Sequence, residues 1–300
     1  MSIDALLVNP VFLSQNEAER ELMSPYIPLG LLYLGAFLRE RDFQVEIFDG
    51  TFARGNQDFI AALETHQPKT VGITAVKPNG DKVLELAAIA KQHNAFVVVG
   101  GPDPTYSPDF YLQNPVVDLV VHHEGELTLA EVLSSRQDGD QPAHALGDMP
   151  GIAYRDQFGD LVVNPRRDYL LNLDQLPAPA RDMVDIEKYL QVWREQNGYA
   201  SLSISVSRGC PYGCKWCADA VHGQDFRIRS VESVVAEVKS LMDIYNIDRL
   251  RVVDDVDGLD AQWIADWAAV AEQEDAVLPF EALYEVERQD IPMLDIRDSL

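Results

Sequence analysis

The sequence predicts an α/β protein in which a Rossmann-like parallel sheet is followed by a partial (β/α) barrel. Short apolar strands alternate with amphipathic helices over the first third to half of the chain, a pattern typical of parallel sheets with helices on both faces. A second, shorter β/α alternation follows a proline-rich segment. We therefore expect a Rossmann-like domain at residues 1–135, a connector at 136–198 and a partial barrel at 199–300.

The first region is predicted to contain five short strands and four helices. The strands are expected at Ala5–Asn9, Gln44–Phe48, Thr70–Thr74, Phe96–Val99 and Leu119–Val121. The helices are expected at Leu29–Arg41, Phe59–His66, Val83–His93 and Leu127–Ser134. Parallel sheets bind ligands at the carboxyl ends of their strands. The loops expected to carry function are therefore Asn9–Phe12, Thr74–Asn79, Gly100–Thr105 and His122–Glu126.

The connector is expected to hold one hairpin and one stiff extended piece. Ile152–Tyr154 and Leu161–Val163 flank the turn sequence Phe158-Gly159-Asp160. Leu176-Pro177-Ala178-Pro179-Ala180 is extended because each proline restricts both itself and the residue before it. Such a segment is more typical of a link between domains than of a domain.

The third region is predicted to begin with a strand in which every second residue is serine. Its strands are expected at Ser201–Ser207, Leu250–Val253 and Leu278–Tyr284. Ser230 and Asp260 have side chains suited to a helix N-cap, and an apolar helical stripe follows each of them. The alternation indicates a barrel of β/α units.

The charge and hydropathy of the chain exclude two classes of partner. The formal net charge is -25 with a pI near 4.4, whereas nucleic acids and anionic membranes attract basic surfaces. A solvated acidic surface explains this charge. No run of about 18 apolar residues predicts a membrane span, and the first residues lack the basic start of a signal peptide. We therefore expect a cytoplasmic protein.

The three cysteines, Cys210, Cys214 and Cys217, lie within eight residues of one another. An odd, clustered set is a poor disulfide framework and a good soft-metal site. The C-x3-C-x2-C spacing lets three thiolates bind three irons of a [4Fe–4S] cluster and leaves the fourth iron open. An open iron can chelate S-adenosylmethionine (AdoMet) and reduce its sulfonium, which yields a 5′-deoxyadenosyl radical.

Other interpretations of the polar motifs stay open at the level of sequence. A structural zinc site could use His222 as a fourth ligand, although zinc sites favour two C-x2-C pairs and only one is present. A plain electron carrier usually has four cysteines. Asp254-Asp255-Val256-Asp257 is either a strand-end pair at the barrel mouth or a divalent-cation site.

The cysteine segment resembles the radical SAM superfamily, whose signature is C-x3-C-x-aromatic-C. Trp216 occupies the aromatic position, and Phe226-Arg227-Ile228-Arg229-Ser230 is similar to the family's continuation into a helix. Asp254 and Asp255 resemble an acidic pair of the subfamily with an N-terminal cobalamin-binding domain. The resemblance implies that Trp216, Asp254 and Asp255 lie in the AdoMet region.

The N-terminal region is similar to the cobalamin-binding domain of that subfamily. Its P-x-x-P-L-G-L-x-Y-L element matches Pro25 to Leu34, its G-G-x-x-x-T loop matches Gly100 to Thr105, and Glu124-Gly125-Glu126 matches the last three places of a G-E-G-E turn. Glycines at strand ends also let the backbone approach a large flat ligand. The residues thereby assigned to cobalamin are Thr74, Lys77, Gly100, Gly101, Pro102, Glu124 and Gly125.

Two departures from the family pattern qualify the resemblance. The D-x-H-x-x-G sequence that supplies an axial histidine is absent, so no histidine ligand to cobalamin is expected, and some family members bind no cobalamin. A β/α unit takes about 30 or more residues, so only about three units fit after Ser201, whereas the family's barrel has about six. We expect a truncated or minimal member whose barrel needs a partner or self-association.

The resemblance implies a radical SAM enzyme that uses cobalamin for methyl transfer to a substrate carbon, or for cyclisation. Its substrate would be a small molecule or a peptide, and its electron donor a flavodoxin or ferredoxin. The competing hypothesis is a non-catalytic accessory protein that binds the cluster and cobalamin.

Overall fold

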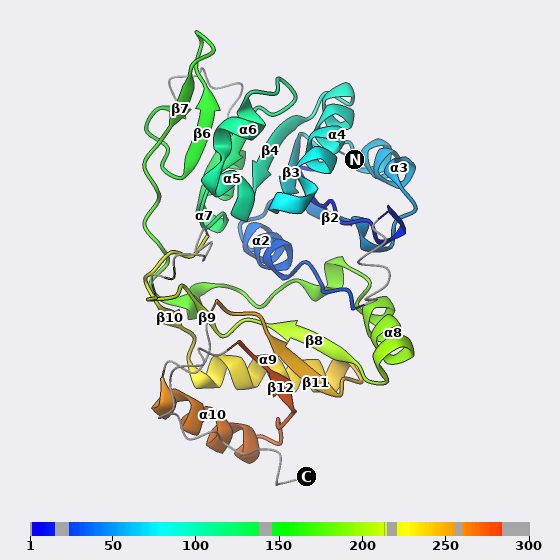
Figure 1. The fold of residues 1–300 in the computed structure, drawn as a ribbon, viewed down its shortest axis with the longest axis vertical. Coiled ribbons are helices and arrows are strands. Elements are labelled where there is room, and N and C mark those ends of the chain that lie inside the picture. The colour runs from blue at the N-terminus through cyan, green and yellow to red at the C-terminus, as the bar shows by residue number, and fades with distance from the viewer. Residues whose placement is uncertain are drawn as a thin grey trace.

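Helix α2 (Leu29–Arg39) lies between two sheets in the computed structural model, in which residues 2–15, 24–137, 146–212, 214, 221–255 and 260–283 are described (Figure 1). A seven-stranded sheet lies on one side of α2, and a three-stranded sheet lies on the other. None of the helices in the described ranges is long and apolar enough to cross a membrane.

The first sheet has the predicted parallel strands, and its strand order reverses between β1 and β3. The strands are β1 (Ala5–Asn9), β2 (Val45–Asp49), β3 (Thr70–Thr74), β4 (Phe96–Gly100), β5 (Leu119–Val121), β6 (Ile152–Arg155) and β7 (Leu161–Val163). Their order is β2-β1-β3-β4-β5-β6-β7, with β1 to β5 parallel. The hairpin expected in the connector is β6–β7, which pairs antiparallel with β5 and extends this sheet.

Each face of the first sheet is covered by helices through its own apolar core. Successive residues of β1 point to opposite faces, so Leu6 packs toward α3 (Asn56–His66) and α4 (Gly80–Gln92), and Leu7 packs toward α2 and α7 (Glu126–Gln137). Two short helices, α5 (Pro102–Tyr106) and α6 (Pro108–Leu112), occupy a segment in which no helix was predicted. Both have five residues and begin with proline, so they show no helical periodicity.

Helix α2 joins the two halves of the molecule because it is apolar on both sides. Eight of its eleven residues are buried. Leu31 and Phe37 belong to a core of the first sheet, whereas Leu32 and Tyr33 belong to the core of the second. A helix that is hydrophobic all round is buried between two layers.

The second sheet is parallel and carries its helices on the side away from α2 (Figure 1). Its order is β12 (Phe280–Glu281), β11 (Arg249–Val252) and β8 (Ser201–Ile204), and α9 (Val231–Ile244) and α10 (Ala261–Gln273) cover it. Ser230 and Asp260 cap these helices as predicted, since their side chains accept hydrogen bonds from the backbone N–H of Ser233 and Trp263.

Helix α8 (Ile186–Asn197) lies in the segment expected to be a connector, where no helix was predicted. The same segment contributes Arg181 to a buried ion-pair cluster with Glu237 and Arg229, called here the Glu237 cluster. Arg181 Nη1 lies 2.8 Å and Arg229 Nη1 lies 2.5 Å from the Glu237 carboxylate. Arg181 also donates to the carbonyl of Ser203 in β8. The connector is thereby fastened to the second sheet.

Candidate functional site

A pocket of about 380 Å³ lies at the carboxyl ends of β1, β3, β4 and β5. The strand order reverses between β1 and β3, which is where open α/β sheets bind ligands. Each of the four predicted functional loops contributes at least one residue to its wall, among them Asn9, Thr74, Gly100 and His123. The four predicted loops therefore meet at one pocket at this edge of the sheet.

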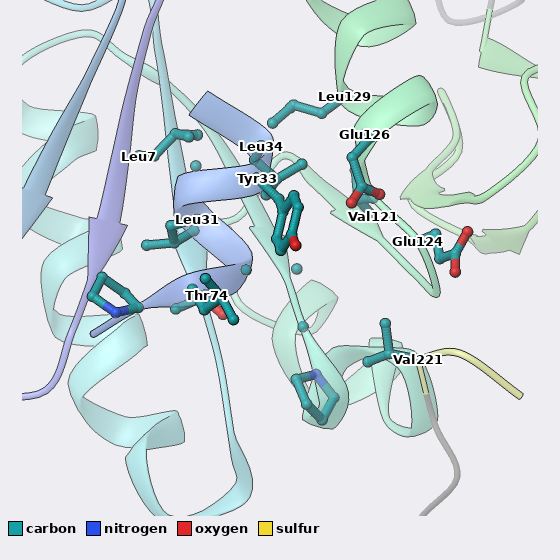
Figure 2. Close-up of a pocket in the computed structure, with 18 of the residues that line it drawn as sticks. Leu7, Leu31, Tyr33, Leu34, Thr74, Val121, Glu124, Glu126, Leu129 and Val221 are labelled. Carbon is teal, nitrogen blue, oxygen red and sulfur yellow. The ribbon is translucent and has the colours of Figure 1, made fainter. Parts of the chain in front are cut away.

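The inner part of the pocket is apolar and extends between the sheet and α2. It is lined by Leu7, Leu31, Leu34, Val98, Val121 and Leu129. Figure 2 shows Leu31, Tyr33 and Leu34 projecting from α2 around the same space. Gly72, in the middle of β3, also lines it, and a Cβ there would lie 3.2 Å from Leu7 Cδ2. The missing side chain leaves a slot in the sheet wall.

Glycines shape two further parts of the wall. Gly101 has φ +110°, and a Cβ on it would lie 2.8 Å from the carbonyl oxygen of Ala75, so only glycine permits this turn after β4. Gly30, in the first turn of α2, is exposed and has nothing within 4 Å of the position of its Cβ. It leaves the entrance beside α2 open.

The outer wall of the pocket is charged and comes from both halves of the molecule. Glu124, Glu126, Arg208 and His222 line it. Arg227 does not line the pocket but pairs with Glu124, and these five residues are called here the Glu124 cluster. Glu124 Oε1 lies 2.8 Å from Arg227 Nη1, 3.2 Å from His222 Nδ1 and 3.5 Å from Arg208 Nη1. Glu126 accepts a 2.6 Å hydrogen bond from Arg208. Apart from His222, these side chains are at most 10% exposed.

These contacts fix the charge states at the outer wall. Burial alone would raise the pKa of Glu124, but the hydrogen bond from His222 and the charges of Arg208 and Arg227 lower it to about 2. Burial works against the charged form of Arg208 too, yet Glu126 and Glu124 raise its pKa above the usual value. Burial raises the pKa of the neighbouring Tyr33 to about 12, so its hydroxyl stays protonated.

The cysteine segment begins beside the same wall. Gly209, with φ +84°, and Cys210 follow Arg208 directly, and the Cys210 N–H donates to the carbonyl of Gly223 at 3.0 Å. Cys210 is buried and Cys214 is exposed, and both are free thiols. Cys217 and Trp216 lie outside the described residues, so the convergence of three cysteines and the place of the aromatic residue stay predictions.

Asp254 and Asp255 hold the backbone that leads into the cysteines. Asp254 accepts hydrogen bonds from the backbone N–H groups of Val206 at 3.0 Å and Ser207 at 2.6 Å. Asp255 accepts one from Gly209 at 3.2 Å. Neither carboxylate lines the pocket. Their assignment to the AdoMet region stays a prediction, and the structure adds a positioning role.

Comparison with known proteins identifies the first region. The family of the B12 binding domain matches residues 20–133. An uncharacterized methyltransferase from Pyrococcus horikoshii is 32% identical over 264 residues, which cover 79% of this chain and 54% of that protein. Residues 20–133 are therefore a B12-binding domain.

Two solved structures share the fold of this chain. The cobalamin-dependent S-adenosylmethionine radical enzyme OxsB, solved with aqua-cobalamin and S-adenosylmethionine, has a TM-score of 0.76 at 21% identity over 93% of this chain and 38% of its own. The radical S-adenosylmethionine methyltransferase TsrM from Kitasatospora setae, solved with cobalamin and a [4Fe–4S] cluster, has a TM-score of 0.69 at 22% identity over 92% of this chain and 52% of its own. The chain spans about half the length of the curated relative it matches.

The pocket of the B12-binding domain gathers most of the residues assigned to cobalamin from sequence. Those that line it are Thr74, Gly100, Gly101, Pro102, Glu124 and Gly125. Lys77 is exposed in a short 3-10 helix (Lys77–Asn79) and does not line the pocket. Sequence reasoning missed Gly72, although a glycine inside an apolar strand marks a close approach of a ligand or backbone. It also missed Arg208, for which the sequence offered no signal.

Proposed function

We propose that this chain binds cobalamin in the pocket of its B12-binding domain and a [4Fe–4S] cluster on Cys210, Cys214 and Cys217, and that it serves AdoMet-dependent radical methyl transfer to a small-molecule substrate. One observation carries the proposal. The outer wall of the pocket is built by Arg208 and His222, which flank the cysteine segment on either side. The two cofactor sites are therefore neighbours.

The residues of the pocket fit cobalamin. The glycine turn at Gly101 and the open face at Gly30 leave room for a flat ring at the strand ends. The apolar slot beside Gly72 suits an aromatic tail, and the polar rim, with Asn9 and Thr74, suits amide groups. Cys210 and Cys214, both free thiols on a loop that begins at a left-handed glycine, suit iron rather than a disulfide.

When bound, the cluster would supply the electron that cleaves AdoMet, and cobalamin would supply the methyl group. The chain's own residues fix the position of each site. Asp254 and Asp255 fix the backbone that leads into Cys210. Leu31 and Leu34 of α2 exclude water from the inner pocket. An electron donor such as flavodoxin or ferredoxin would reduce the cluster.

The pocket is tested by a substitution that blocks it without harming the fold. Gly30→Leu adds a side chain where nothing lies within 4 Å, at a helical position where glycine costs about 1 kcal/mol. We expect unchanged or raised thermal stability and at least about a tenfold weaker binding of hydroxocobalamin, followed by its absorbance. Ala61→Leu, exposed on α3, is the matched control. Equal affinity in Gly30→Leu and wild type would place cobalamin elsewhere.

The cluster is tested by metal content after anaerobic reconstitution with iron and sulfide. Cys214→Ala is expected to lose the brown absorbance and most of the iron, whereas His222→Ala is expected to retain both. A zinc site with His222 as fourth ligand would instead lose its metal in both variants. Zinc in place of iron in the wild type would overturn the proposal.

The reaction is tested with the reconstituted protein, reduced in the presence of AdoMet. Formation of 5′-deoxyadenosine is the expected result. Its absence from protein with an intact cluster would favour the accessory role. Methyl transfer and cyclisation are separated by mass spectrometry of the product once a substrate is found.

A further inference from the structure

One turn of the B12-binding domain serves two sites at once. Glu124, Gly125 and Glu126 follow β5 and line the pocket proposed for cobalamin. Glu124 and Glu126 also bind residues on both flanks of the cysteine segment, namely Arg208 before it and His222 and Arg227 after it. Figure 2 shows Glu126 beside Tyr33 and Leu34 of α2, and Glu124 farther out along the same turn.

The flanking residues are bound at fixed points. Arg208 lies in β9 (Ser207–Arg208) and Arg227 lies in β10 (Arg227–Ile228), which pair antiparallel and so close the base of the cysteine loop. Arg208 reaches both carboxylates, while Arg227 reaches Glu124 and also donates to the carbonyl of Leu170. A shift of the turn therefore has to shift the base of the loop.

Buried charges make this connection specific. An apolar contact tolerates sliding, whereas a desolvated carboxylate that loses its guanidinium partner is left as an unpaired buried charge. The Glu124 cluster therefore permits few relative positions of the turn and the loop. The ion pairs of the Glu124 cluster therefore form a continuous set of contacts between the pocket and the cysteine loop, through which a change at one site can affect the other.

We infer that Glu124 and Glu126 are positioning residues that couple the two cofactor sites, so that filling the pocket with cobalamin sets the cysteine loop for its cluster and the reverse. The inference rests on the proposed function. By linkage, the coupling is reciprocal: the cluster raises the affinity for cobalamin by the same factor by which cobalamin raises the affinity for the cluster.

The test measures the dissociation constant of hydroxocobalamin before and after iron–sulfur reconstitution. In the wild type the cluster is expected to tighten binding by about 5- to 150-fold, the usual range of coupling between sites. Glu124→Gln keeps the size and one acceptor oxygen but removes the charge. It is expected to lose most of this ratio whatever its own affinity for hydroxocobalamin, because the ratio compares the same variant before and after reconstitution. A residue needed only for stability would not change the ratio.

A matched control and a second variant complete the test. Asp182→Asn breaks the exposed Arg39–Asp182 pair, which also links α2 to the connector but touches neither site, and is expected to keep the ratio. Arg227→Lys keeps the charge and loses the planar fork, and is expected to lower the ratio if Glu124→Gln fails to fold.

Three outcomes overturn the inference. The first is a wild-type ratio near one, and the second is an undiminished ratio in both Glu124→Gln and Arg227→Lys. The third is that both variants unfold by circular dichroism, because the ion pairs would then serve stability alone. A wild type that binds no hydroxocobalamin or no cluster contradicts the proposed function itself, and the coupling fails with it.

Discussion

The two sheets of this protein are stabilised by different kinds of contact. The first sheet buries nearly all of its parallel strands between two apolar cores, and α2, α3 and α4 begin without a side-chain cap. The second sheet packs on a single apolar core and adds polar contacts to it. Asp185, Ser230 and Asp260 cap α8, α9 and α10, and the Glu237 cluster lies against the sheet. Two cores can stabilise helices with plain ends, whereas one core is supplemented here by specific polar contacts.

The largest expected effect is in the Glu237 cluster. Glu237→Ala leaves Arg181 and Arg229 buried without a carboxylate, so the free energy of unfolding is expected to fall by about 3–5 kcal/mol. Urea denaturation followed by circular dichroism measures this. A loss below about 1 kcal/mol would show that the second sheet does not depend on these charges.

A pH-dependent contribution is expected from Glu124. Its pKa is about 2 in the folded protein and 4.5 as the ordinary value, so its stabilisation is present above pH 4.5 and is lost as the pH falls toward 2. The full contribution is about 3 kcal/mol near neutral pH, of which about 2 kcal/mol is lost by about pH 3.

The contribution of Glu124 is measured by comparing the unfolding free energies of two proteins at each pH. The gap in unfolding free energy between wild type and Glu124→Gln is expected to narrow as the pH is lowered from about 6 to about 3. Leu6→Ala, in the apolar core of the first sheet, is expected to cost about 2–5 kcal/mol at every pH at which the protein is folded. A pH-independent gap for Glu124→Gln would contradict the lowered pKa.

A smaller effect is expected at the helix caps of the second region. Ser230→Ala and Asp260→Ala each remove the acceptor for one backbone N–H, at a cost of about 1 kcal/mol. Ser230→Thr keeps the acceptor and is the control. The midpoint of urea denaturation reports each change. An unchanged midpoint in both alanine variants would show that the caps do not stabilise the second region.

The smallest effect is expected on the surface of the first region. Lys82 and Glu85 form an i, i+3 pair on α4 at 2.6 Å, and the Glu85 side chain is 48% exposed. Glu85→Gln is expected to change the free energy of unfolding by less than about 1 kcal/mol. A loss as large as that in Glu237→Ala would break the distinction between surface and buried charges.

Much of the first region could be predicted from local pattern. β1, β3 and β5 have the predicted bounds, because each is a short, mostly apolar run that ends at or just before a polar residue. Six of the seven residues assigned to cobalamin line the pocket, at the carboxyl ends of β3, β4 and β5, and Lys77 does not. Short right-handed connections between parallel strands place all of their carboxyl ends at the same edge of the sheet. The sequence could therefore predict that the loops after these strands lie together.

Other elements had no such signal. Helices α5 and α6 are too short for periodicity, and α8 lies in a segment interpreted from its prolines as a connector. The β6–β7 hairpin was recognised, but its pairing with β5 is a long-range contact. Which strands pair depends on how side chains pack across the whole sheet, so the residues of one strand do not determine its partner.

The sequence by itself determined the cofactor chemistry expected of Cys210, Cys214 and Cys217, since spacing within one loop is a local property. It also indicated the edge of the sheet at which the pocket lies. Only the tertiary structure decided that Glu124 and Glu126 face Arg208 and Arg227, more than 80 residues along the chain. Charged residues are abundant in this sequence, and only folding determines which of them lose water and become partners.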